Sequence, residues 1–266
     1  MKKFGLQLYS IRDRLTTDKE IKESFLAISK MGYTNVQTAG TYEGIAPESF
    51  AKHAKDAGLE ICGTHYSYEK IKNDIEGTVK YHNTIGTKII GVGGAPSMKV
   101  FENKENLLAF IKEFNELAEI YSKHGFGFTY HNHATEGIKI DGKPVFEYMI
   151  EGFGDKVQFC FDTYWAQMAG FDIVHTIERL SGRMPILHLK DFQAMVEYRL
   201  EGGKIMHAPR YVEVGSGNLD FARIISAAEK AGCRYFVVED EYYSNGSSMD
   251  SVNTSATYIK NNLIEK

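Results

Sequence analysis

Residues that commonly bind metal ions recur where apolar stretches end in the second half of the sequence. Each of four apolar runs ends in such a residue, within the segments YHNH, FDT, LHLK and VEDE. Imidazole nitrogens and carboxylate oxygens suit divalent transition-metal ions. If four neighbouring strands bring these segments together, two imidazoles and two carboxylates form a site for one divalent ion. The candidate metal ligands are His131, Asp162, His188 and Glu239.

Each candidate also has an ordinary structural interpretation. A histidine at the end of a strand is often a hydrogen-bonded rim residue. Asp162 could cap the helix that follows it, and Glu239 could pair with a neighbouring lysine. Four such residues on four consecutive predicted strands nevertheless favour a metal site over four independent coincidences.

The order of elements that must position these residues is regular. Short apolar runs, polar breaks and helical stretches alternate from end to end. Glycine stops such as those in SKMGYTNVQ and NTIGTKIIG end a helix just before a strand. The predicted strands are Phe4–Tyr9, Asn35–Thr38, Glu60–Tyr66, Lys88–Val92, Gly127–His131, Val157–Phe161, Ile186–Leu189 and Tyr235–Val238.

Eight strands that alternate with helices in 266 residues predict an α/β fold, a single (β/α)8 barrel domain spanning residues 1–266. The clearest helix is ENLLAFIKEFNELAEIYSKHG, whose apolar residues recur at three- and four-residue steps and which Gly125 ends. A doubly wound open sheet usually has a Gly-rich phosphate turn after its first strand, and QLYSIRDR contains none. The apolar face of the helix consists of Leu107, Phe110, Ile111, Phe114, Leu117, Ala118 and Tyr121.

One connection is much longer than the others. Residues 191–217 follow the seventh predicted strand, so they leave the face of the barrel where active sites of this fold lie. Segments of this length are often functional, and this one could form part of a wall or lid. A decorating hairpin with no role in chemistry is the alternative.

Composition excludes several functional classes. The formal net charge is −4, whereas nucleic-acid binders usually carry a basic surplus, so no nucleic-acid partner is expected. No window has the roughly 18–20 apolar residues of a membrane span, and the N-terminus lacks an apolar signal stretch. Three cysteines without a C-x-x-C pair predict free thiols. We therefore expect a soluble cytoplasmic protein.

Several segments resemble the xylose-isomerase-like superfamily of barrels. They are GLQLYSIRD, YHNH, FDTYWAQMAGFD, LHLKD, EVGSGNLDF and VVEDE. The superfamily includes sugar isomerases and epimerases, inosose dehydratases and type IV endonucleases, and YHNH is typical of a subgroup described as sugar phosphate isomerase/epimerase. Its members bind one metal through Glu, Asp, His and Glu on strands five to eight. The resemblance implies Asp162, His188 and Glu239 as ligands, with His131 where the family has the first Glu.

That departure changes the charge of the site. The family ligand set carries three negative charges, whereas the set with His131 carries two. An added imidazole also favours softer ions. The expected cofactor is therefore one divalent metal ion, with Mn, Co, Fe or Zn favoured over Mg.

The departure also concerns proton transfer. In the epimerases that this chain resembles, two metal-bound glutamates move the proton, and only Glu239 remains. His133 lies two residues after His131, on the same side of an extended strand, and is a candidate base or substitute ligand; orienting a neighbour is the alternative. Lys190 could stabilise an enolate, or pair with Asp191 or Glu239.

Residues near the other strand ends are candidates for substrate binding. Gln7, Tyr9 and His65 could donate to sugar hydroxyls, and Lys190 could contact a substrate oxygen. Trp165 could supply an apolar wall for a sugar ring. Packing at the rim explains Tyr9 equally well, and a core or interface role explains Trp165.

The predicted reaction is proton abstraction alpha to a carbonyl in a small-molecule sugar, by a metal-dependent isomerase or epimerase. A lyase or dehydratase acting on a keto-inositol or 3-keto-glycoside is the main alternative. A non-catalytic sugar-binding barrel and a metal-dependent endonuclease agree less well with the sequence. The missing Gly-rich turn favours an unphosphorylated substrate. The identity of the sugar and a homo-oligomeric state are left open.

Overall fold

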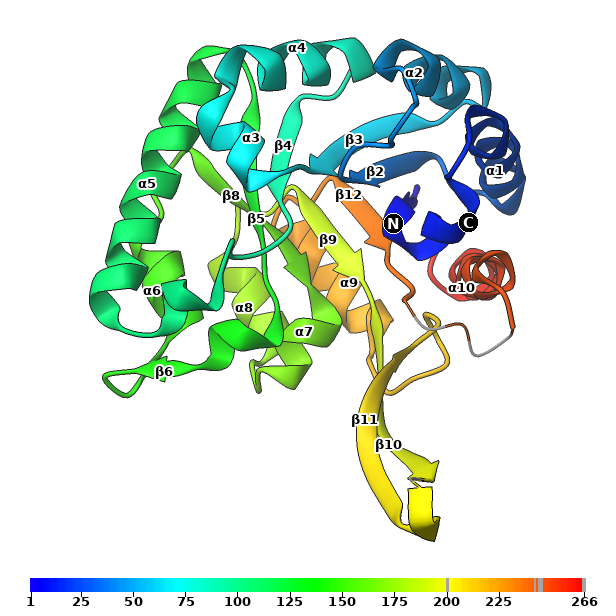
Figure 1. Cartoon of the computed structure of the whole chain (residues 1–266). Helices are drawn as coiled ribbons and strands as arrows, with labels where there is room; N and C mark the ends of the chain where they lie inside the picture. The colour runs from blue at the N-terminus through cyan, green and yellow to red at the C-terminus, as the bar shows by residue number, and fades with distance from the viewer. Residues whose placement is uncertain (200, 242, 244–245, 265–266) are drawn as a thin grey trace.

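Eight parallel strands form the central sheet of the protein, described in a computed structural model for residues 1–199, 201–241, 243 and 246–264. The strand order is β3-β2-β1-β12-β9-β8-β5-β4, and Figure 1 shows helices around it. The strands are β1 Gly5–Gln7, β2 Asn35–Ala39, β3 Glu60–His65, β4 Ile89–Val92, β5 Gly127–His131, β8 Val157–Asp162, β9 Ile186–Leu189 and β12 Tyr235–Val238. The predicted (β/α)8 barrel is thus confirmed.

The first and last strands of that order lie next to each other, so the barrel is nearly closed. The backbone N–H of Tyr66, just after β3, donates to the carbonyl of Gly91 in β4 over 2.8 Å. A Cβ atom on Gly91 would lie only 2.1 Å from the carbonyl oxygen of Thr64. Glycine at this position therefore allows the two strands to approach.

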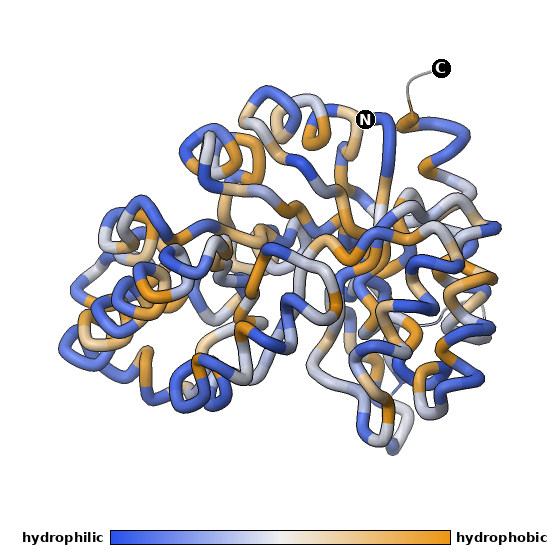
Figure 2. Tube along the Cα trace, turned by 90° about the horizontal axis from the view of Figure 1, so that it is seen from above, coloured by the Kyte–Doolittle hydropathy of each residue, from blue (hydrophilic) through white to orange (hydrophobic). Residues whose placement is uncertain are grey.

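The helices form an outer layer on the strands. Figure 2 shows hydrophilic residues along their outward-facing turns. The residues predicted to form the apolar face of the long helix are the buried residues of α5. They lie on one face because they recur at the helical period. The helices are α1 Asp18–Met31, α2 Pro47–Asp56, α3 Tyr68–Asn73, α4 Ile75–Ile85, α5 Lys104–Lys123, α6 Val145–Gly152, α7 Thr163–Met168, α8 Ile173–Arg179, α9 Phe221–Lys230 and α10 Ser248–Asn262.

The first strand is shorter than the predicted Phe4–Tyr9. It ends at Gln7, and a 3-10 helix, Leu8–Arg14, follows directly. The side-chain oxygen of Gln7 accepts the backbone N–H of Tyr9 over 3.3 Å and so caps that helix. Local capping by Gln7 therefore ends a run that the apolar pattern alone extends further.

The long connection after β9 contains a two-stranded hairpin, β10 Asp191–Arg199 paired with β11 Ile205–Val212. Figure 1 shows the hairpin projecting away from the barrel. At the base of the hairpin, the ring of Tyr211 packs edge-on against Tyr164 of α7 with centroids 5.2 Å apart. The outer part of the hairpin extends away from the barrel, and none of the described residues of this segment lines the cavities at the strand ends.

The base of the hairpin is fixed by the buried carboxylate of Asp191. This side chain accepts backbone N–H groups from Gly215 and Gly217, each over 2.9 Å, and from Phe192 and Leu219. Four donors converge on one carboxylate, which holds both ends of the segment at the barrel rim.

Within the described residues, no helix is long and apolar enough to span a membrane.

Candidate metal centre

The four residues predicted as metal ligands lie together at the carboxyl ends of β5, β8, β9 and β12. These strands are adjacent in the sheet, so residues up to 108 positions apart in the sequence meet at one site. All four side chains are buried, and one ligand atom from each lies within 4.8 Å of the others. They are His131, Asp162, His188 and Glu239.

Individual distances show how tightly the group is drawn together. Nδ1 of His188 lies 2.6 Å from Oε2 of Glu239 and 3.6 Å from Oδ2 of Asp162. Nε2 of His131 also lies 3.6 Å from that oxygen of Asp162. The Asp162 carboxylate is therefore in ion-pair contact with both imidazoles.

Apart from the 2.6 Å contact between His188 and Glu239, the same atoms have no hydrogen-bond partner in the described part of the chain. They are Nε2 of His131, Oδ2 of Asp162, Nδ1 of His188 and Oε2 of Glu239. Buried polar atoms are rarely left without partners, because each costs about 1–3 kcal/mol of desolvation. Four that converge on one point fit a divalent ion, and their mixture of nitrogen and oxygen is a normal donor set for one.

Two of these residues combine a structural role with a free ligand atom. Oδ1 of Asp162 accepts the backbone N–H of Trp165 over 2.8 Å and caps α7, which leaves Oδ2 facing the cluster. Oε1 of Glu239 lies 3.4 Å from Nζ of Lys190, which leaves Oε2 facing the cluster. The capping and ion-pair interpretations of these residues therefore coexist with a metal site.

Sequence reasoning missed Gln37, which orients one imidazole. Nε2 of His188 lies 2.5 Å from Oε1 of Gln37, a fully buried residue of β2. With the proton on Nε2, the lone pair of Nδ1 points at the cluster, as when a ligand histidine is held by a neighbouring oxygen. The available signal was an amide side chain in the middle of a predicted barrel strand, β2, whose sequence is NVQTA.

The charges of the cluster stabilise one another. Although burial opposes ionisation, His131, His188 and Lys190 hold the pKa of Asp162 well below its usual value. Burial likewise opposes ionisation of Glu239, but Lys190 and His188 keep its pKa well below normal. Both carboxylates are thus anionic at neutral pH, as metal ligands must be.

His188 carries a proton in the metal-free protein. Burial lowers its pKa, but Cys160, Glu239 and Asp162 outweigh that effect and raise the pKa well above the usual value. A metal ion and this proton compete for Nδ1. Metal affinity should therefore rise with pH.

Lys190 is fully buried and pairs with carboxylates instead of lining the cavity. Its ammonium contacts Glu239 and, more closely, Glu241. Burial opposes its charge, but these carboxylates and Asp162 raise its pKa above the usual value, so it stays protonated. Asp191, the other partner considered for it, binds backbone N–H groups instead.

His133 lies beside the four-residue cluster and outside it. Its ring centroid is 4.8 Å from that of His131 and 5.2 Å from that of Trp165. Burial and the nearby His131 lower its pKa to about 4. The imidazole is therefore neutral at pH 7, with a nitrogen available to a substrate.

A cavity of about 370 Å³ opens next to the cluster and brings together most of the predicted substrate-binding residues. In it, Nε2 of Gln7 donates to Oε1 of Gln37 over 3.1 Å, and His65 lies 4.8 Å from His131 between ring centroids. Glu241, to which the sequence analysis gave no role, also lines it. The lining residues are Gln7, Tyr9, Ala39, His65, Gly93, His131, His133, Trp165, Glu239 and Glu241.

The molecule is thus an eight-stranded α/β barrel with a buried cluster of histidines and carboxylates, able to bind a metal, at the carboxyl ends of its strands. Active sites of such barrels lie at this end. The chain belongs to the xylose isomerase-like TIM barrel family, whose model matches residues 25–262.

Inosose dehydratases and a sugar phosphate isomerase/epimerase are among the proteins that this chain resembles. An inosose dehydratase of Geobacillus thermodenitrificans (strain NG80-2) is 28% identical over 137 residues, which is 49% of this chain and 46% of that protein, so the match spans less than half of the relative. An inosose dehydratase of Serratia proteamaculans (strain 568) is 24% identical over 211 residues, 69% of this chain and 70% of the relative. The crystal structure of a sugar phosphate isomerase/epimerase from Parabacteroides distasonis ATCC 8503 superposes with a TM-score of 0.82 at 26% identity, covering 100% of this chain and 96% of that one.

Proposed function

We propose that this protein is a sugar isomerase or epimerase that depends on one divalent metal ion and removes a proton alpha to a carbonyl. The observation that carries the proposal is the convergence, beside a polar cavity, of four buried ligand atoms with no hydrogen-bond partner elsewhere in the described part of the chain. The kinship with sugar isomerases and epimerases supports the same class of reaction.

The ligand set favours Mn, Co, Fe or Zn over Mg, because two imidazoles accompany only two carboxylates. A bound ion of this kind would polarise the carbonyl and hydroxyl oxygens of the substrate and so acidify the neighbouring C–H bond. The residues that would hold it are His131, Asp162, His188 and Glu239.

His133 is the base in this proposal. It lines the cavity beside the metal ligands, and its ring is neutral at pH 7, so a ring nitrogen has a lone pair to accept the proton from carbon. Lys190 keeps Glu239 ionised and in place through their ion pair, so it is a positioning residue. Return of the proton to the other face gives an epimer, and return to the neighbouring carbon gives an isomer.

A dehydratase or lyase is the second candidate, favoured by the two inosose dehydratases among the relatives. The same proton abstraction leads to elimination when a leaving group lies beta to the carbonyl. His131 stands where the family has its first glutamate, so one of the two carboxylate bases is missing. Epimerisation uses a base on each face of the substrate, whereas elimination does not.

The first experiment measures metal content by mass spectrometry for wild type, His131→Ala and Glu239→Gln, with His175→Ala as control. His175 is exposed on α8, so its loss removes an imidazole without touching the cluster. We expect near-stoichiometric Mn, Co, Fe or Zn in wild type and the control, and loss in both cluster variants. A wild type that stays metal-free after supplementation contradicts the proposal.

The second experiment follows proton abstraction by NMR in D2O with the metal-loaded protein. D-Fructose, 3-keto-glucose and 2-keto-myo-inositol are the probes. Deuterium at the carbon next to the carbonyl, with an isomer or epimer as product, supports the main proposal. Loss of water or of a substituent identifies the dehydratase or lyase, and absence of exchange with all three probes counts against both.

A further inference from the structure

A second and larger cavity lies beside the metal centre. Its volume is about 580 Å³, compared with about 370 Å³ for the cavity at the cluster. The two share Gly93, His133 and Trp165 as lining residues, so they adjoin. Each volume lies within the roughly 300–1,000 Å³ of small-molecule sites. One substrate has room to extend from the first cavity into the second.

Two glycines, Gly93 and Gly94, leave the boundary between the two cavities free of their side chains. A Cβ atom on Gly93 would lie 3.1 Å from the ring of His65, and one on Gly94 would lie 2.9 Å from the ring of His133. Gly94 also has a φ of 141°, a conformation that other residues rarely adopt. The chain after β4 therefore passes close to both imidazoles without placing a side chain between the cavities.

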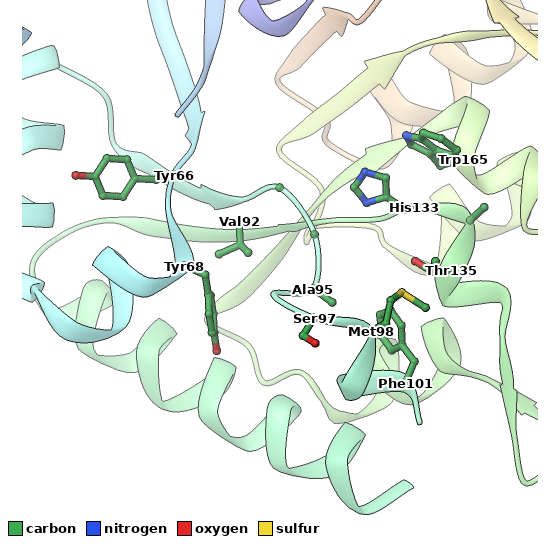
Figure 3. Close-up of a pocket in the computed structure, with 13 residues that line it drawn as sticks. Tyr66, Tyr68, Val92, Ala95, Ser97, Met98, Phe101, His133, Thr135 and Trp165 are labelled. Atoms are coloured by element: carbon green, nitrogen blue, oxygen red, sulfur yellow. The ribbon is translucent and has the colours of Figure 1, made fainter. Parts of the chain in front are cut away.

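The second cavity is lined mainly by aromatic and apolar side chains. Figure 3 shows Tyr66 and Tyr68 on one side, Trp165 beside His133 on the other, and Met98 with Phe101 below them. The hydroxyl of Tyr68 donates to Glu113 over 2.6 Å, so this polar group is already engaged. The walls thus offer flat apolar surfaces, which suit another flat apolar group.

The charged side chains around the two cavities are of one sign. Among the described residues that line either cavity, none is Lys or Arg, and the larger cavity has no Asp or Glu either. Phosphate groups are normally held by such cations or by helix N-termini. The lining therefore lacks the cationic side chains that would pair with a phosphorylated substrate.

Trp165 links the two cavities and has an unused hydrogen-bond donor. Its Nε1 is buried and has no partner in the described part of the chain. The ammonium of Lys190 lies 4.8 Å from the centre of its ring, which helps to fix the indole. The ring of Trp165 lines both cavities, so a substrate that extends from one into the other would pass along it.

We propose that the larger cavity is a subsite for an aromatic or similarly apolar substituent attached to the reacting sugar. The natural substrate would then be a keto-glycoside, with its carbonyl in the sugar ring, and a free keto-sugar would bind more weakly at the same metal centre. This inference rests on the proposed function for the position of the sugar at the metal centre. It names the class of substrate for that site.

Binding is tested with the metal-loaded protein by isothermal titration calorimetry. The probes are 4-nitrophenyl β-D-glucopyranoside, methyl β-D-glucopyranoside, maltose and glucose 6-phosphate. Burial of an aromatic ring should make the nitrophenyl compound bind about tenfold or more tightly than the methyl compound. Equal affinity, no detectable binding of the nitrophenyl compound, or tighter binding of maltose or glucose 6-phosphate overturns the assignment.

Fluorescence locates the bound ring. Trp165 is the single tryptophan of the chain and lines the cavity, so bound nitrophenyl groups should quench the protein's tryptophan emission. Binding without quenching would place the ring elsewhere and contradict the proposal.

A pair of matched variants tests the walls. Met98 lies at the cavity and is 56% exposed, whereas Met195 lies on the projecting hairpin and is 66% exposed, so both positions should accept Glu without loss of folding. Met98→Glu should weaken binding of the nitrophenyl compound about tenfold, and Met195→Glu should leave it unchanged. Equal effects of the two substitutions refute the subsite. Failure of the proposed reaction would appear separately, as absent deuterium exchange from the keto-sugar probes while the nitrophenyl compound still binds.

Discussion

Acidification should destabilise this protein through His82, a fully buried histidine of α4. Nδ1 of His82 donates to the carbonyl of Thr78 over 2.7 Å, and Nε2 lies 2.9 Å from the hydroxyl of Thr64. The neutral ring, with one donor and one acceptor, satisfies both contacts. Burial lowers its pKa from 6.5 to about 4.

The direction in which stability changes with pH follows from the pKa values of His82 in the unfolded and folded chains. Between pH 6.5 and 4 the unfolded chain binds a proton at His82 and the folded chain does not, so stability falls as pH falls. The full loss below pH 4 is about 3 kcal/mol, and about 2 kcal/mol of it has occurred by pH 5. Above pH 6.5 the contribution is fully present.

Urea denaturation at pH 7.5 and pH 5, in the presence of a chelator, measures this effect for wild type and His82→Gln. From pH 7.5 to pH 5, the free energy of unfolding should fall about 2 kcal/mol less in His82→Gln than in wild type. This difference should hold whatever the stability of the variant at pH 7.5. His124→Gln is the control, because His124 is exposed, and it should follow wild type. Identical pH dependence of His82→Gln and wild type would refute the reasoning.

If the His82 variant does not fold, the wild-type protein still provides a test. In an NMR titration of the histidine Cε1–H signals, the signal assigned to His82 should show a ring that stays neutral down to about pH 4, as the ring of His133 also should. A His82 signal that titrates near its ordinary pKa would be the contrary result.

Two further predictions concern the metal and the hairpin. Chelation should lower the Tm of wild type, measured by calorimetry, by about 5–10 °C, because an ion at 100 times its Kd adds about 2.7 kcal/mol to the free energy of unfolding. The Tm of His131→Ala should not change. A wild-type Tm that chelation does not affect contradicts this prediction. Asp191→Asn should cost about 2–4 kcal/mol in urea denaturation and speed proteolysis within residues 191–217, because an amide group replaces an oxygen that accepts Gly215 and Gly217. Asp155→Asn, at an exposed position, is its control, and equal behaviour of the two variants would disprove the anchoring role.

The sequence by itself determined the barrel and the group of candidate metal ligands at its strand ends. Apolar periodicity identified the buried face of α5 because a helix repeats its contacts every three or four residues. The strands that contain His131 and His188 were predicted with their observed bounds. In a parallel barrel the carboxyl ends of neighbouring strands meet at one rim, so ligands on four consecutive strands had to converge.

Local sequence could not say which of two roles a polar residue takes. Asp162 was open between helix cap and ligand, and Glu239 between ion pair and ligand. The structure gives each carboxylate both kinds of contact, one through each oxygen. That division depends on the direction of each side chain, which no spacing in the sequence records.

Only the tertiary structure revealed the partners that come from distant parts of the chain. Gln37 reaches His188 across 151 residues, and the larger cavity collects Tyr66, Met98 and Trp165 from three separate connections. The direction of the hairpin also depends on how Tyr211 packs at its base. Periodicity reports which face of an element is buried, whereas these contacts depend on how loops fold over the barrel rim, and that is decided by packing between segments far apart in sequence.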